Sequence, residues 1–231
     1  MPKTAVRTAP VRFESCGVAY RIDGHGVIHQ EDPKPFVYDA AYVAVHTGKP
    51  DYGEKARALS LLRLGWSAGV YSARFDGDIP SSLVDVGYAD GAFMREARKI
   101  VPRVFGVEAA DVPVPDGCLR IKDASGVGAS LVTFWDSFEH HPDLEFVRDL
   151  DCQMIALSVP YCHEAGGGWF DGWKHRKPNE HLHHFSPHAI GAFMEARGWK
   201  AVAAGHHEDA LRGPLACGRE NILSAAFVRN A

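Results

Sequence analysis

Several features that define large protein classes are missing from this sequence. No apolar run approaches the roughly 20 residues that a membrane-spanning helix needs. No apolar core follows the basic residues near the start, as it would in a secretory signal. The five cysteines are scattered and never form a C-x-x-C pair, which disfavours a disulfide framework or a zinc ribbon. We therefore expect a cytoplasmic protein that does not enter a membrane.

Two further absences concern ligands. Neither sign of charge dominates, because the formal net charge is −4, so the chain has no general attraction to nucleic acid. The dinucleotide fingerprint G-x-G-x-x-G and the phosphate-binding G-K-S/T motif are both missing. These absences argue against a nicotinamide-linked oxidoreductase. Histidine, by contrast, is abundant: there are thirteen, most of them after residue 139.

The most informative stretch, residues 83–93, predicts a buried strand, a tight turn and a helix. The strand is apolar except for Asp85, and the turn runs from Gly87 through Tyr88 to Gly91. A glycine-bounded turn at this place lets a ligand approach the backbone closely and aims free N–H groups at it. Plain turn chemistry is the alternative explanation.

Strand and helix patterns alternate from residue 82 onward. This alternation predicts an α/β fold: a doubly wound, mostly parallel seven-stranded sheet with helices on both faces. The strands are expected at 82–86, 103–108, 118–122, 130–135, 153–159, 199–205 and 222–229. No helix is evident between the last two strands, so we expect them to pair antiparallel at one edge. The helices are expected at 39–46, 54–72, 92–99, 142–150 and 187–197.

We divide the chain into an N-terminal cap or lid, residues 1–50, and a Rossmann-like domain, residues 51–231. A hairpin is expected within the cap, from residues 18–21 and 27–29. The helix at 54–72 repeats apolar residues at three- and four-residue spacing, which predicts its buried face. That face comprises Ala58, Leu61, Leu62, Gly65, Trp66 and Gly69.

Acidic residues follow the ends of several predicted strands. In such a sheet a ligand lies at the carboxyl ends of the strands, near the reversal of strand order. Glu108 comes 21 residues after Gly87, where an acid can accept both hydroxyls of a ribose. Asp123 can accept a hydrogen bond from an adenine amino group, and Asp136 lies beside the expected reactive end of the ligand. Taken alone, each acid is also explained as a solvated loop carboxylate.

Three ordered stretches of the sequence resemble class I methyltransferases that use S-adenosylmethionine (SAM). The first resembles the glycine-rich first motif, although Tyr88-Ala89 stands where many members have Cys-Gly. The other two, at the end of the fourth strand and after the fifth, resemble segments of the ubiquinone-methyltransferase-like branch. The stretches are residues 85–91, 131–142 and 158–161 with 173–186, and the resemblance covers residues 80–229.

This resemblance implies a SAM-dependent methyltransferase. The cofactor would be bound by the turn and the strand ends, at Asp85, Gly87, Tyr88, Gly91, Glu108, Asp123 and Asp136. A Tyr88 ring lying in the cofactor cleft would instead indicate a non-catalytic relative. Tyr38 and Tyr42 precede the core, where an aromatic residue of the family can close over the cofactor.

The resemblance also implies that the methyl group goes to an oxygen or carbon atom of a small-molecule acceptor, the expected partner. An oxygen acceptor needs a base, for which His140 and His181 are the candidates, with packing histidines as the alternative. The pair His181 and His183 can supply two metal ligands. Loop histidines without a metal are commoner, and we expect no metal. The residues expected to contact the acceptor are Tyr161, His175, Arg176 and His184.

Other functions must be weighed against this one. The D/N-P-P-Y/F motif of base-amine methylation and the Pro-Cys of cytosine C5 methylation do not follow the fourth strand. Modification of a nucleotide or nucleic acid through the basic run 174–177 is one alternative, although we do not expect nucleic acid as a partner. A non-catalytic binding protein of the same fold is another. A homodimer is the assembly that we consider.

Overall fold

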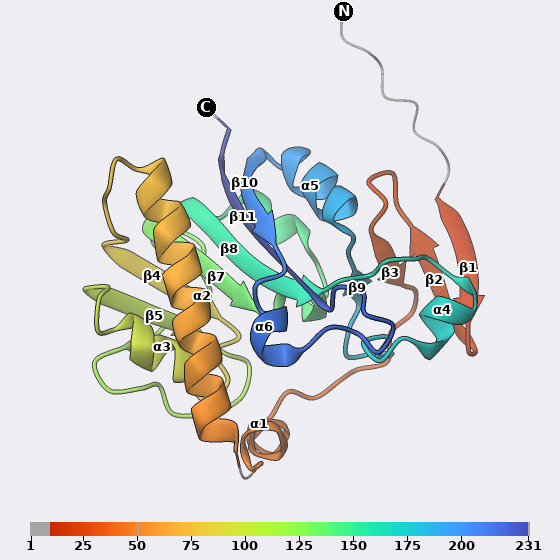
Figure 1. The fold of residues 1–231 in the computed structure, drawn as a ribbon, viewed down its shortest axis with the longest axis horizontal. Helices are drawn as coiled ribbons and strands as arrows, with labels where there is room; N and C mark the ends of the chain where they lie inside the picture. Colours follow the sequence, from red (N-terminus) through yellow and green to blue (C-terminus); the bar gives the residue numbers. More distant parts are fainter. Residues whose placement is uncertain (1–9, 50, 231) are drawn as a thin grey trace, which may run out of the picture.

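A seven-stranded sheet is the largest element of the protein, in a computed structural model that describes residues 10–49 and 51–230. The strand order is β10-β11-β8-β7-β4-β5-β6 (Figure 1). The strands are β4 (Ser82–Val86), β5 (Arg103–Val107), β6 (Leu119–Arg120), β7 (Ala129–Trp135), β8 (Cys152–Pro160), β10 (Trp199–Gly205) and β11 (Ile222–Arg229). Neighbouring strands are parallel except that β11 is antiparallel to both β8 and β10. The predicted doubly wound sheet with an antiparallel last pair is confirmed.

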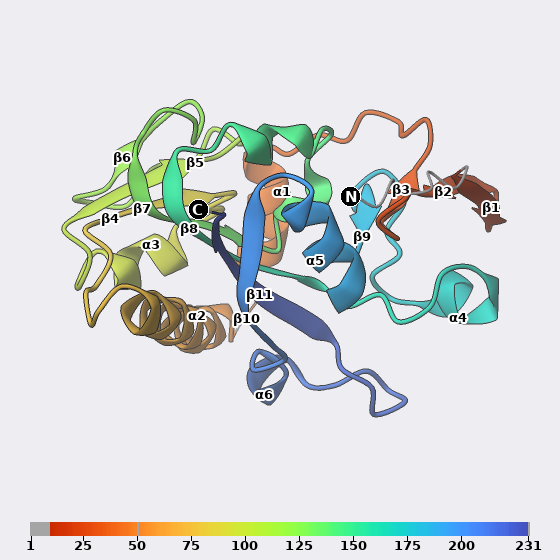
Figure 2. The same ribbon diagram turned by 90° about the horizontal axis from the view of Figure 1, so that it is seen from above.

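Helices cover both faces of this sheet (Figure 2). α2 (Tyr52–Arg74) and α3 (Ala92–Ala97) pack on one face, and α5 (Pro187–Glu195) packs on the other. Strand side chains alternate between the two faces, so Leu83 joins the α2–α3 cluster and Val84 joins the α5 cluster. β4 lies between β5 and β7, so the strand order reverses there, and the carboxyl ends of β4 and β7 flank the position where such sheets bind ligands.

One strand and two connecting segments differ from the prediction. β6 is limited to Leu119–Arg120, at the edge of the sheet, where it pairs with β5 alone. The segment predicted as a helix at 142–150 forms only a 3-10 turn, η2 (Glu145–Arg148), in which the Asp149 N–H donates to the Phe146 carbonyl at 3.1 Å. A one-turn helix, α6 (Asp209–Arg212), lies between β10 and β11, where none was expected.

The predicted buried face of α2 is wrong. The residues that it buries are Ser60, Arg63, Leu64, Ser67 and Tyr71, whereas the side chain of Leu61 is 46% exposed. The Ser67 hydroxyl donates a hydrogen bond to the Arg63 carbonyl at 2.7 Å, and the Arg63 guanidinium forms ion pairs with Asp136 and Glu208. Polar groups that find partners can be buried, so apolar spacing alone does not identify this face. Within the described residues, no helix has the length and apolar character to cross a bilayer.

A second, four-stranded antiparallel sheet forms a cap beside the main sheet (Figure 1). It contains β1 (Val11–Ser15), β2 (Val18–Ile22), β3 (Ile28–Gln30) and β9 (His183–His184). The predicted hairpin is β2–β3, and β1 extends it. β9 comes from the long loop after β8 and pairs with β3, so the cap is assembled from two distant parts of the chain.

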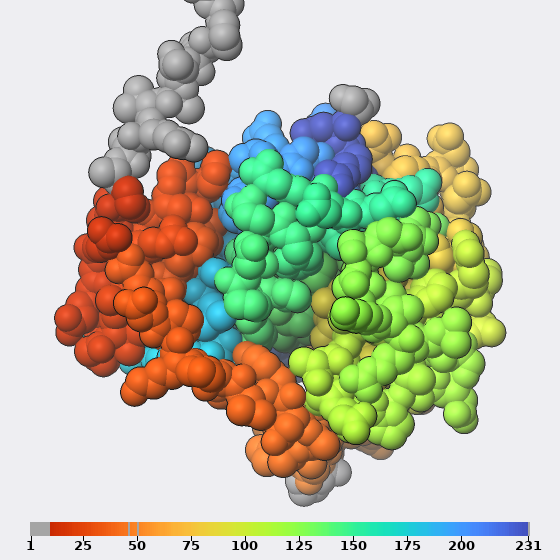
Figure 3. Space-filling model, turned by 180° about the vertical axis from the view of Figure 1, so that it is seen from behind, coloured from red at the N-terminus to blue at the C-terminus, as the bar shows by residue number. Residues whose placement is uncertain are grey.

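The linker from the cap leads into α1 (Ala40–Thr47), which Asp39 caps by accepting a hydrogen bond from the Tyr42 N–H at 2.8 Å. Figure 3 shows this orange segment running from the cap along one face of the molecule, toward the yellow-green segments that follow β5. The loop after β8 adds α4 (Gly167–Gly172), whose Phe170 packs in the cap core against Tyr20. The linker and this loop therefore connect the cap to the carboxyl ends of the main strands.

Candidate active site

The turn after β4 has the conformation that its two glycines allow. Gly87 and Gly91 have φ angles of +81° and +73°, a region that other residues rarely adopt. A Cβ atom on Gly87 would lie 2.5 Å from the Cβ of Ser137, and one on Gly91 would collide with the ring of Pro115. Ala89, where the family usually has glycine, also has a positive φ of 49°. Both glycines are thus required by backbone conformation and by contacts within the protein.

Glu108 lies at the carboxyl end of β5 and faces this turn. Its Oε2 accepts a hydrogen bond from the Ala89 N–H at 2.7 Å, and its Oε1 accepts one from the Ala110 N–H at 3.0 Å. Each carboxylate oxygen can accept a further hydrogen bond, and the side chain is only half-buried. The carboxylate therefore has the acceptor capacity for two ribose hydroxyls, as SAM requires.

Asp85 and Tyr88 point into the protein core. Asp85 is buried in the sheet, where its Oδ1 accepts a hydrogen bond from the Thr133 hydroxyl at 2.8 Å. Burial raises the pKa of Asp85 to about 7, and the bond from Thr133 opposes that rise. The Tyr88 ring packs against Gly106 in the α2–α3 cluster, and its hydroxyl donates to the Val112 carbonyl at 3.0 Å. These side chains support the turn, and their contact with a cofactor stays a prediction.

The other two predicted cofactor acids already have partners. Asp123 is exposed and accepts a hydrogen bond from the Ser125 N–H at 3.0 Å. Asp136 has a left-handed φ of 55° at the end of β7, and both of its oxygens accept hydrogen bonds from Arg212 at 2.8 Å. Arg63 lies 2.5 Å from the same carboxylate. The Asp136 N–H also donates to the Ser158 carbonyl at 3.1 Å, and contact of Asp136 with a cofactor stays a prediction.

Asp136 belongs to an ion cluster that the sequence did not indicate. The cluster joins four side chains: Arg63 of α2, Asp136 after β7, Glu208 at the start of α6 as its N-cap, and Arg212 of α6. Glu208 is fully buried, and its oxygens lie 2.8 Å from the Arg63 Nε and 3.1 Å from the Arg212 Nη1. The two nearby arginines keep the pKa of Asp136 far below its usual range, although burial acts in the opposite direction. Four charges of balanced sign thus connect α2, β7 and α6.

The two predicted catalytic histidines lie together beside the end of β7. The 3-10 turn η1 (Phe138–His140) follows Asp136, and its Glu139 carbonyl accepts a hydrogen bond from the Leu182 N–H at 2.9 Å. This bond brings the loop after β8 onto η1, so the rings of His140 and His181 have centroids 4.7 Å apart. Glu139, which the sequence did not single out, completes the group: ligand atoms of these three side chains lie within 4.8 Å of one another.

Burial sets the charge of this group. Desolvation lowers the pKa of His140 to about 4 and lowers that of His181 further, so both rings are neutral near pH 7. Burial also raises the pKa of Glu139 well above its ordinary value. Tyr38 fixes one ring: its hydroxyl lies 2.7 Å from His140 Nδ1 and donates to the Glu180 carbonyl at 3.1 Å. The hydroxyl has one proton, so both bonds form only if Nδ1–H is the donor to Tyr38, which leaves His140 Nε2 unprotonated.

The residues expected to contact the acceptor do not converge on one point. Tyr161, after β8, stacks between His163 and His206, with ring centroids 3.8 Å and 5.3 Å away. His175 Nε2 lies 2.8 Å from the Asn221 side-chain oxygen. The other two belong to the cap: Arg176 donates to the Ser15 carbonyl, and His184 is buried against the cap aromatics. The His175 ring also stacks on that of His181, with centroids 6.3 Å apart, so His175 borders the histidine pair.

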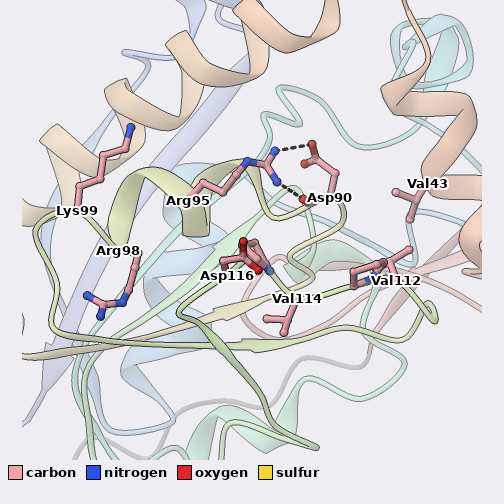
Figure 4. A pocket seen from close by; sticks show the side chains of 10 residues that line it. Val43, Asp90, Arg95, Arg98, Lys99, Val112, Val114 and Asp116 are labelled. Atoms are coloured by element: carbon pink, nitrogen blue, oxygen red, sulfur yellow. Dashed lines mark hydrogen bonds and ion pairs between the residues drawn. The ribbon is translucent and has the colours of Figure 1, made fainter.

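A cavity of about 580 Å³ opens beside the turn, between α1, α3 and the segment that follows β5 (Figure 4). Asp90 is the residue of the turn that lines it, and its carboxylate is paired with Arg95 at 2.9 Å. Arg95 lines the cavity from α3, Arg98 and Lys99 line it from the turn that ends this helix, and Val43 lines it from α1. The cavity borders the turn on the α3 side, while Glu108 and the histidine pair lie elsewhere around the strand ends.

The comparisons agree with this geometry. A family profile described as "Methyltransferase domain" matches residues 66–204. No curated protein matches the sequence. Among solved structures, the chain is similar to the Burkholderia thailandensis 1,6-didemethyltoxoflavin-N1-methyltransferase with bound 1,6-didemethyltoxoflavin and S-adenosylhomocysteine. The identity is 14% and the TM-score 0.55, over 97% of this chain and 100% of that one.

The plantazolicin methyltransferase BpumL in complex with S-adenosylhomocysteine is also similar, at 11% identity and a TM-score of 0.52, over 83% of this chain and 95% of that one. At such identities the likeness establishes the fold. The family profile spans more than half of the chain, and it matches from within α2 to β10. The chain therefore belongs to the methyltransferase-domain family, and it is a methyltransferase whose cofactor is SAM.

Proposed function

We propose that this enzyme methylates an oxygen or carbon atom of a small molecule, as does the ubiquinone-methyltransferase-like branch that its motifs resemble. The observation that carries the proposal is the histidine pair beside the end of β7, with ring centroids 4.7 Å apart. The lone pair of an unprotonated imidazole is the group here that can accept a proton from an acceptor hydroxyl or activated C–H. An acceptor held by the loop after β8 would meet this pair.

Methyl transfer from a sulfonium is an in-line displacement, so the protein mainly orients the acceptor and excludes water. Bound SAM supplies the electrophilic methyl carbon. In this account Glu108 holds the ribose, and the backbone around Gly87 and Asp136 borders the methyl-bearing end. His140 Nε2 receives the acceptor proton, because Tyr38 occupies the other ring nitrogen. Tyr161 and His175 line the acceptor side.

The part of the proposal that needs testing is the kind of atom, oxygen or carbon, that receives the methyl group. The toxoflavin enzyme, by its name, methylates a nitrogen. The shared fold is therefore compatible with methyl transfer to different kinds of atom. Nucleic acid is a weaker candidate, since the basic run 174–177 is partly committed: Lys177 lies 2.8 Å from the Glu180 carboxylate. A non-catalytic role is disfavoured by Tyr88, whose ring lies in the core cluster.

The test supplies SAM labelled with ¹³C in its methyl group to a panel of phenols, enols, N-heterocycles and oligonucleotides. The carbon chemical shift of the product identifies the atom that was methylated. Methoxy or C-methyl products from small molecules support the proposal, and products confined to N-methyl groups or oligonucleotides contradict it. His140→Gln should lower kcat by about 100-fold or more without weakening S-adenosylhomocysteine binding. The matched control is His188→Gln, an exposed histidine of α5.

A further inference from the structure

The group formed by Glu139, His140 and His181 contains a buried acid with no hydrogen-bond partner. The Glu139 side chain is 1% exposed, and neither of its oxygens has a partner among the described residues. His140 Nε2 lies 3.9 Å from Oε1, too far for a hydrogen bond. Buried carboxyl groups are normally hydrogen-bonded, because an unsatisfied one destabilises the fold. Such a group calls for an explanation by a ligand.

The histidines also present unused nitrogen atoms. His181 is 4% exposed, and its Nδ1 has no hydrogen-bond partner within the part of the chain that the structure describes. His140 Nε2 carries a lone pair, because its Nδ1–H is donated to Tyr38. One carboxylate and two imidazole nitrogens thus lie within 4.8 Å of one another. Closing onto an ion needs only a small side-chain movement, since ligands about 2.1 Å from a metal are roughly 3–4 Å apart.

We infer that Glu139, His140 and His181 bind a divalent transition-metal ion at the acceptor side of the active site. Two imidazoles and one carboxylate suit zinc or ferrous iron, whereas magnesium and calcium prefer oxygen ligands alone. Three protein ligands leave at least one coordination position open. The contact from His140 to Tyr38 is the kind of outer contact that orients a metal-binding imidazole.

This inference rests on the proposed function for its role and gives His140 a more specific one. With an ion bound, the Nε2 lone pair is a ligand, and the open position accepts an oxygen of the methyl acceptor. The ion would then lower the pKa of that hydroxyl, so that its proton can leave to water before the oxygen attacks the methyl group, which replaces proton removal by a free histidine. The basic side chains around Glu139 already have acidic partners, because Lys177 is paired with Glu180 at 2.8 Å and Arg212 with Asp136 and Glu208, so the ion would supply positive charge at Glu139.

Zinc binding to the EDTA-treated full chain, measured by calorimetry without methyl donor or acceptor, tests the site directly. We expect one zinc ion per chain. Affinity should fall at least tenfold in Glu139→Gln, in His140→Gln and in His181→Gln, since even outer contacts of a metal site are worth about 10–100-fold. His188→Gln and Glu195→Gln, at exposed positions of α5, are the matched controls. No binding to wild type, or equal binding to all variants, overturns the inference.

X-ray absorption of the wild-type protein loaded with one zinc ion keeps the test decisive if a variant fails to fold. Scattering from two imidazoles without sulfur supports the site, and its absence overturns it. Because these measurements involve no methyl transfer, they also separate the two proposals. If the protein binds zinc but methylates only nitrogen, the metal site is supported and the proposed acceptor is contradicted. If it methylates oxygen but binds no zinc, the proposed acceptor is supported and the metal site is contradicted.

Discussion

Asp85, at the end of β4 before the glycine turn, shows how a single buried residue can oppose folding. Its carboxyl is buried in the sheet, and burial raises its pKa to about 7. The native state therefore holds a proton that the unfolded chain releases above about pH 4. Stability contributed by this group is lost as the pH rises between these values, by up to about 4 kcal/mol in total.

Asp85→Asn should consequently stabilise the protein, and more so at high pH. An amide has a similar shape, keeps an acceptor for Thr133 and has no charge to bury. We expect the gain in unfolding free energy to be about 2–3 kcal/mol larger at pH 8 than at pH 5. Urea denaturation at both pH values measures it, with the exposed Asp123→Asn as the control. A gain of equal size at both pH values would mean that Asp85 does not titrate in this range.

Residues differ in how well the sequence predicted them. The spacing of Gly87, Gly91 and Glu108 reflects local backbone geometry and strand ends, which a sequence pattern carries. Glu139 was missed because its importance comes from burial beside His181, which the loop after β8 brings from 42 residues away. Arg63 was missed for the same kind of reason, since its partners lie on β7 and α6.

At the scale of elements, the ion cluster connects α2, β7 and α6. Arg63→Met would leave Glu208 buried with only one of its two arginines, at a cost of about 3–5 kcal/mol in unfolding free energy. The double variant Arg63→Met/Glu208→Met removes one charge of each sign, so it should lose clearly less than the sum of the single losses. A double-mutant cycle by urea denaturation gives this coupling. Additive losses would show that the cluster does not act as a unit.

Tyr38, in the linker before α1, should orient the His140 ring of the histidine group. Tyr38→Phe removes the oxygen that accepts the His140 Nδ1–H, so the ring loses its fixed orientation. We expect zinc affinity to fall about tenfold while the unfolding temperature changes little. Tyr52→Phe, which removes another partly buried hydroxyl near the turn, is the matched control. Equal zinc affinity in both variants would argue against an orienting role for Tyr38.

Prediction of the elements succeeded where a periodic pattern was long and failed where tertiary contacts decided. The seven strands follow from alternating runs, and only the shortest, β6, was clearly overextended. The helix expected at 142–150 became η2, and the buried face of α2 was misassigned because its buried polar groups find partners elsewhere in the fold. The pairing of β3 with β9 joins segments about 150 residues apart, and no local signal encodes it.

At the scale of the whole molecule, Asp23 stabilises the cap. Burial would raise its pKa, but hydrogen bonds from His29 and from the His25 and Val27 N–H groups lower it to about 2. Its stabilisation is present above about pH 4 and lost as the pH falls through about 2. Asp23→Asn should therefore cost about 2 kcal/mol at pH 7 and almost nothing at pH 2. Thermal unfolding across this range measures the difference, and a loss that persists at pH 2 would contradict it.

The cap and the main sheet share the loop after β8, so we expect the two sheets to unfold together. The division into residues 1–50 and 51–231 stays a prediction. The cap sheet itself draws on both parts, since β9 lies in the second part and pairs with β3 of the first. Under the proposed function, the cap would position the acceptor, while the turn and Glu108 would position the cofactor. Changes at Glu108 should therefore alter donor binding more than acceptor binding.

Calorimetric titration with S-adenosylhomocysteine, on wild type, Glu108→Ala and the exposed control Glu195→Ala, tests the central claim most directly. If Glu108 holds the ribose, its loss should weaken binding by about 1–3 kcal/mol, or roughly 5–150-fold, while the control binds like wild type. NAD should not compete. Wild-type affinity in Glu108→Ala, or tighter binding of NAD than of S-adenosylhomocysteine, would contradict the cofactor site at the carboxyl ends of β4 and β5.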